Sequence, residues 1–211
     1  MGLAIQKLLE IASSPFIPGG ILFGSDGLDR FGDNGRAIME MLFQRNGFFC
    51  FESALRIFPA DTTESSWGIH EWNRQELWKG EYFGLADRFF CFAEDIFGNQ
   101  FCIYDNKVRT FNPETGDAEV VASSLEDWAA KVFDDYNSMT GYRFARDWQK
   151  IHGRLPARDR LMPKKPFVLG GNYDLSNLIA MDSVRVMKNL GNLAHQIHDL
   201  PDGAKIEFRI I

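Results

Sequence analysis

Four short strand-like runs follow one another closely in the middle of this chain, and helical patterns come mainly after them. The first two runs are rich in phenylalanine, and the last two flank residues 112–117, which are dense in turn-forming residue types. Strands followed by helices favour an α+β fold, with a central antiparallel or mixed twisted sheet flanked by helices, over alternating β and α units. The four runs are residues 88–93, 100–104, 107–111 and 118–121.

Capping signals and apolar spacing predict the helices. Ser123 and Glu126 have the spacing of a capping box, so a helix is expected from there to about residue 136. Its buried stripe would include Leu125 and Trp128. Apolar periodicity predicts further helices near the N-terminus and at residues 36–45, 141–152 and 184–197.

The remaining segments are expected to be short strands or connections. Residues 155–166 contain three prolines and are predicted to form an irregular connection. Strands, or in the second case a strand pair, are predicted at residues 21–23, 48–59, 175–181 and 204–210.

The chain has 211 residues and no segment that looks like a linker. We expect one α+β domain at residues 1–153, with its core at about residues 37–136. A C-terminal α/β extension, residues 154–211, should pack on this domain, because it is too short to bury a core of its own.

Composition is that of an ordinary globular protein, with 45% hydrophobic and 25% charged residues. No apolar run approaches the ~18 residues needed to cross a bilayer, and Lys7 and Glu10 interrupt the N-terminal stretch where a signal peptide would be apolar. The three cysteines form no CxxC pair and are expected to be buried small hydrophobes. These features predict a cytoplasmic protein that does not bind membranes.

Charge is distributed unevenly along the chain. The net charge is −6, but residues 141–165 carry +6, so the remainder of the chain carries −12. An acidic body repels free nucleic acid and attracts basic partners. The basic segment is either a phosphate-binding strip or, as is commoner, a solvated helix face.

No residue pattern predicts catalysis, a metal or a cofactor. The glycine-rich residues 24–35 match neither a phosphate loop nor a calcium loop and are expected to form turns. His195 and His198 could share a helix face with Asp199, but a third metal ligand and a second shell are missing, so a solvent-facing pair is expected. Glu94 and Asp95 are adjacent, so their side chains should point in different directions rather than form an acid–base dyad.

The run from Phe89 to Phe101 resembles the strand–turn–strand signature of the SUKH superfamily, a group named after fungal cell-wall-synthesis regulators. Residues 111–116 look like its next hairpin, and Leu125 to Trp128 are similar to its closing helix. Trp72 and Trp78, ahead of the first strand, also fit. The resemblance covers residues 37–136, and residues 166–203 look like an extension found in one bacterial branch.

This resemblance implies a non-enzymatic protein that binds other proteins. Many bacterial members neutralise a cognate toxin, often a nuclease, and an acidic body suits the basic cleft of such a toxin. Two alternatives remain open: a regulatory interaction module of the fungal type, and a protein that binds a small ligand through its glycine-rich loop and tryptophan cluster. A homodimer is also compatible with the sequence.

The binding surface is expected near the central turn, where acidic and aromatic residues gather. If both tryptophans belong to the core instead, only the acids would remain available. The predicted partner-binding residues are Trp67, Trp72, Glu94, Asp95 and Asp105.

Overall fold

The structure is a computed structural model that describes residues 2–19, 28–201, 203–204, 206 and 208–210. The predicted strand at residues 21–23 lies outside the described residues. Among those described, no helix is long and apolar enough to span a bilayer.

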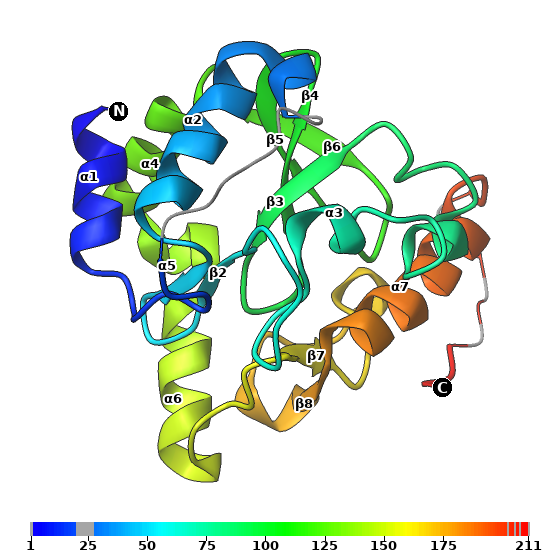
Figure 1. The fold of residues 1–211 in the computed structure, drawn as a ribbon. Coiled ribbons are helices and arrows are strands. Elements are labelled where there is room, and N and C mark those ends of the chain that lie inside the picture. The colour runs from blue at the N-terminus through cyan, green and yellow to red at the C-terminus, as the bar shows by residue number, and fades with distance from the viewer. Residues whose placement is uncertain (1, 20–27, 202, 205, 207, 211) are drawn as a thin grey trace.

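A six-stranded sheet forms the centre of the molecule (Figure 1). Its strands pair in chain order, each antiparallel to the next, so every connection is a hairpin or a longer loop between neighbours. This is the α+β architecture expected from the sequence. The strands are β1 Phe48–Cys50, β2 Leu55–Ile57, β3 Phe90–Glu94, β4 Gln100–Tyr104, β5 Lys107–Phe111 and β6 Ala118–Ala122.

A second, two-stranded sheet lies in the C-terminal part of the chain, where β7 pairs antiparallel with β8. The prediction that residues 155–166 are irregular is therefore wrong. Leu161 and Met162 are fully buried, and burial against a partner strand outweighs the prolines, of which Pro163 only ends the strand. The two strands are β7 Asp159–Pro163 and β8 Leu178–Asp182.

Seven helices and several short 3₁₀ turns among the described residues surround the sheets. Figure 1 shows α1, α2 and α4 on one side of the main sheet and α7 on the other. The helices are α1 Leu3–Glu10, α2 Gly32–Gln44, α3 Ile69–Trp72, α4 Leu125–Asp134, α5 Tyr136–Thr140, α6 Tyr142–His152 and α7 Ser183–Ile197. The 3₁₀ turns are η1 Asp29–Phe31, η2 Lys79–Tyr82, η3 Phe167–Leu169 and η4 Leu175–Asn177.

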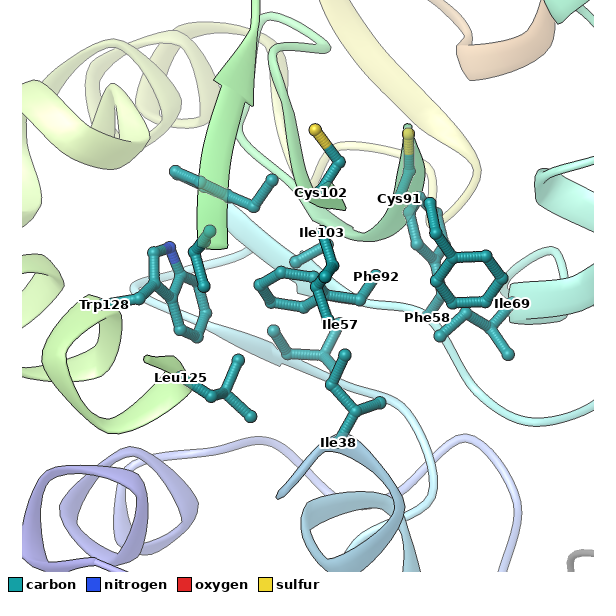
Figure 2. Packing of buried hydrophobic residues seen from close by; sticks show 14 of the residues in the cluster. Ile38, Ile57, Phe58, Ile69, Cys91, Phe92, Cys102, Ile103, Leu125 and Trp128 are labelled. Atoms are coloured by element: carbon teal, nitrogen blue, oxygen red, sulfur yellow. The ribbon is translucent and has the colours of Figure 1, made fainter. Parts of the chain in front are cut away.

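The core forms where α2 and α4 pack on one face of the sheet. Trp128 of α4 meets Phe92 and Phe101 edge-on, with ring centroids 5.0 and 5.3 Å apart. Figure 2 shows Ile38 and Leu125 on the same side, while the thiols of the two labelled cysteines point away from them. The apolar face predicted for the helix after residue 123 is confirmed.

The capping box at the start of α4 differs from the prediction by one residue. Ser124, not Ser123, is the N-cap, and its hydroxyl accepts a hydrogen bond from the Asp127 N–H at 3.1 Å. The Asp127 carboxylate in turn accepts from the Ser123 N–H at 3.1 Å. Because the helix begins one residue later, Glu126 is released from the box and binds elsewhere.

The prediction of a final strand at residues 204–210 is wrong for the residues of that stretch that the structure describes. Ala204 closes a turn onto the Pro201 carbonyl, and Phe208 packs on a small apolar cluster with Met162 and Met181. Alternating apolar residues form a strand only where a neighbouring edge supplies hydrogen bonds.

Candidate binding pocket

The five residues predicted to bind a partner do not form one exposed surface. Trp72, Glu94 and Asp95 have 0%, 0% and 4% of their surface exposed, so the expectation that they face solvent is wrong. Trp67 is half-buried, with the Arg158 guanidinium 4.6 Å above its ring. Of the five, only Asp105, in the turn between β4 and β5, is exposed.

Trp72 belongs to the core, because both the face of its ring and its indole N–H contact buried residues. It stacks on Phe58 with ring centroids 4.8 Å apart, and its Nε1 donates to the Gln100 side chain at 2.8 Å. Gln100 also donates to the Glu94 carboxylate at 3.2 Å. The tryptophan therefore supports a buried polar network instead of a binding face.

Glu94 is the centre of that network, a buried ion cluster that joins the main sheet to β7. Its Oε1 accepts from the Arg56 guanidinium and lies 2.6 Å from Arg160 Nε. All three side chains are fully buried. Arg56 also donates to the Ser183 hydroxyl and the Ala157 carbonyl, both at 2.9 Å. Burial, with the adjacent Arg160 charge, lowers the pKa of Arg56 to about 9.

Asp95 points away from Glu94 and organises the turn between β3 and β4. Its Oδ1 accepts from the N–H groups of Phe97 at 2.8 Å and Asn99 at 2.9 Å, and its Oδ2 accepts from the Asn99 amide at 2.7 Å. Burial raises the pKa of Asp95 to about 7, against the opposing effect of these hydrogen bonds. The prediction that the two neighbouring carboxylates separate and form no dyad agrees with this geometry.

A pocket of about 420 Å³ opens beside Asp95. Three chain segments far apart in the sequence surround it: the β3–β4 turn, the β5–β6 turn and the loop that follows β7. A serine of α5 and a leucine of α7 complete it. The lining residues are Asp95, Phe97, Asn99, Asn112, Pro113, Glu114, Thr115, Ser138, Pro163, Phe167, Val168, Tyr173 and Leu190.

Glu114 is the second carboxylate of the pocket, and only 6% of its surface is exposed. Its two oxygens accept from the backbone N–H groups of Phe167 at 3.0 Å and Val168 at 2.7 Å, so it also fixes the loop after β7. Burial raises its pKa above the usual value. Within the described part of the chain, neither Glu114 nor Asp95 forms a salt bridge, so both carboxylates rely on neutral donors.

Three aromatic rings line the pocket next to these carboxylates. Tyr173 lies flat on Phe167, with centroids 3.8 Å apart and planes 6° from parallel. Phe97 meets both rings edge-on, at 5.6 Å and 6.5 Å. Tyr173 nevertheless has 66% of its surface exposed. Its pKa is raised, first by partial burial and then by the charges of Glu114 and Asp95.

Buried carboxylates beside aromatic faces suit a cationic ligand. The carboxylates provide charge-assisted hydrogen-bond acceptors, and aromatic faces attract cations through their quadrupole. Sequence reasoning missed Glu114, Phe167 and Tyr173. Glu114 looked like an ordinary turn residue, and nothing in the sequence shows that the loop after residue 163 folds over it.

The histidine pair and the glycine-rich stretch were the other candidate sites in the sequence. No group of three or more histidine, cysteine or carboxylate ligands occurs among the described residues. His195 and His198 are exposed as predicted, and His195 stacks on Phe83 with centroids 3.9 Å apart. Residues 20–27 of the glycine-rich stretch lie outside the described residues.

The basic segment at residues 141–165 does not act as one strip. Arg160 is buried in the ion cluster. Arg158 donates to the Thr63 carbonyl at 2.5 Å, and Arg146 and Lys150 pair with Asp147. These four basic residues already have partners within the protein, which favours a structural role for them over a phosphate-binding strip.

Comparison with known proteins adds evidence on the fold alone. No family model matches the chain, and no curated protein matches it either. A solved structure, the crystal structure of Atu4351 from Agrobacterium tumefaciens, is similar over 87% of this chain and 86% of that chain. The sequence identity is 12% and the TM-score 0.56, so the two chains share an architecture, and the likeness carries nothing about ligands or partners.

Proposed function

We propose that this protein is a non-enzymatic, cytoplasmic binding protein that captures a basic surface of another protein, and that its partner is a toxin which it neutralises. The observation that carries the proposal is the pocket, where two buried carboxylates lack a cationic partner among the described residues and lie beside three aromatic rings. A partner that supplies the missing positive charge would bind there.

The charge of the whole chain supports the same class of partner. Outside residues 141–165 the chain carries −12, and such a field accelerates association with a basic protein. The resemblance of residues 37–136 to the SUKH superfamily, in which immunity proteins are common, supports toxin neutralisation as the biological task. Blocking would be steric and electrostatic, with the acidic face covering the toxin's basic cleft.

The test is co-expression with any toxin domain that is encoded beside this gene. We expect the protein to restore growth, to form a complex of fixed stoichiometry with the toxin, and to associate more slowly as salt is raised. Growth that is not restored, together with no complex between the purified proteins, would overturn the proposal. Co-purification of cell-envelope or signalling proteins in place of a toxin would favour the regulatory module.

A further inference from the structure

We propose that the pocket beside Asp95 and Glu114 binds a guanidinium group. The group has two sources of the same chemistry: an arginine side chain of the partner protein, which rests on the proposed function, or a free small guanidine. The charge, shape and size of the pocket support this assignment.

Charge is the first step. Asp95 and Glu114 are both at least nine-tenths buried, and their partners are backbone N–H groups and the Asn99 amide. Each carboxylate offers about four lone-pair sites, so acceptor capacity remains for a ligand. Among the described residues no cation pairs with either carboxylate, and burial raises the pKa of both, so a positively charged ligand would favour their charged form.

Shape distinguishes a guanidinium from an ammonium group. Tyr173 lies flat on Phe167 through one face, and its high exposure leaves the other face available. A planar guanidinium stacks on such a face and directs its N–H groups sideways towards carboxylates, whereas a lysine ammonium is a strongly hydrated point charge. The three aromatic rings therefore favour arginine.

Size is the third step. A volume of about 420 Å³ lies in the lower part of the ~300–1,000 Å³ range of small-ligand sites. It can hold one side chain or a compound of that size. The pocket also spans the β3–β4 turn, the β5–β6 turn and the loop after β7, so a bound group would contact all three segments.

The experiment titrates the full-length protein with small probes and follows binding by calorimetry and by amide NMR shifts. The probes are N-acetyl-arginine amide and three identical short peptides that differ only in one residue: arginine, lysine or citrulline. We expect the arginine peptide to bind more tightly than the lysine peptide, and the neutral citrulline peptide not to bind. Shifts should concentrate at residues 95–99, 112–115 and 167–173.

Variants assign the binding to the pocket. Tyr173→Ala should weaken arginine binding about tenfold, Tyr173→Phe should retain it, and Glu114→Gln should weaken it tenfold or more. Tyr173 is largely exposed, so its variants should fold even if Glu114→Gln disturbs the loop. Glu119→Gln removes the same charge at an exposed site outside the pocket and should change nothing.

Each outcome decides between the sources or against the proposal. Binding of the arginine peptide supports a protein partner, and binding of N-acetyl-arginine amide alone supports the small-molecule source. Equal binding of arginine and lysine peptides would overturn the guanidinium assignment. If no probe binds while the protein still forms a complex with a toxin, this proposal fails and the proposed function stands.

Discussion

At the scale of single residues, Glu94 forms salt bridges with two buried arginines, Arg56 and Arg160. Among the described residues it is the one carboxylate in this ion cluster, so both positive charges depend on it. Removing one member of a buried ionic group leaves the others uncompensated, which typically costs about 3–5 kcal/mol. We therefore expect Glu94→Ala to lower the free energy of unfolding by that amount in urea denaturation. Glu119→Ala, on the exposed face of β6, is the matched control and should change it by less than about 0.5 kcal/mol.

A second variant separates charge from packing. Replacing all three members at once, with Arg56→Met, Glu94→Leu and Arg160→Met, removes every charge and should restore much of the lost stability. If the triple variant is as unstable as Glu94→Ala, the loss comes from shape and hydrogen bonds, and the ionic explanation is wrong.

Asp95 makes stability depend on pH. Its pKa is about 7 in the folded protein against 3.8 ordinarily, so the folded state binds more protons than the unfolded state between these values. Stability from this group is full below about pH 4 and is lost as pH rises to about 7, with a slope of up to about 1.4 kcal/mol per pH unit. Asp95→Asn should flatten this part of the profile, measured by urea denaturation at a series of pH values. An unchanged slope in the variant would assign the effect to Glu114 or Asp159, whose pKa values are also raised.

Sequence reasoning could foresee the separation of Glu94 from Asp95 but not their burial. Separation follows from the local geometry of neighbouring residues. Burial depends on Arg56 from β2 and Arg160 from β7, which reach Glu94 only after the sheets have formed. The same holds for Glu114, whose two donors come from the loop after β7.

At the scale of elements, α1 depends on a residue of α4. No side chain of its own caps the first turn of α1. Instead the Glu126 carboxylate accepts from the N–H of Ala4 at 2.6 Å and of Ile5 at 3.2 Å. Gly2 allows this approach, because a Cβ there would lie 2.1 Å from the Glu126 carboxyl carbon. A negative charge at a helix N-terminus also stabilises the helix through its favourable interaction with the helix dipole.

We expect Glu126→Ala to destabilise the protein by about 1 kcal/mol, the usual value of an N-cap. Faster amide hydrogen exchange should be confined to the first turn of α1 and to its contact with α4. Asp134→Ala, an exposed acid at the other end of α4, is the control and should leave α1 unchanged. Uniformly faster exchange throughout the protein would show that Glu126 supports the core and not the helix start.

Local signals explain which elements the sequence could predict. The strands β3 to β6 carry their own alternation and turn residues, and their predicted bounds differ from the observed ones by at most two residues. The strand β7 could not be predicted, because its support comes from distant segments, including its pairing with β8 and its burial under α7. Gly191 lies where α7 touches the Tyr82 ring, and a Cβ at this position would be 2.7 Å from that ring.

At the scale of the whole molecule, the contacts that join described residues of 154–211 to the rest include a backbone hydrogen bond, an ion pair and a carboxylate that holds a loop. The Leu161 N–H donates to the Ile96 carbonyl at 2.8 Å. Arg160 enters the ion cluster, and Glu114 of the main domain holds the loop after β7. Opening this interface would remove Arg160 from the ion cluster with Arg56 and Glu94. It would also expose the apolar residues under α7 to solvent. We therefore expect the predicted domain and its extension to unfold as one unit.

All five tryptophans precede residue 154, so their fluorescence reports on the domain, while amide exchange in β7, β8 and α7 reports on the extension. We expect the slowest amides of the extension to exchange with the same free energy that fluorescence gives for global unfolding. Glu94→Ala should lower both values together, because the ion cluster belongs to both parts. Extension amides that exchange at a markedly lower free energy would show a separately opening unit, and the pocket between the two parts would then form only in the closed state.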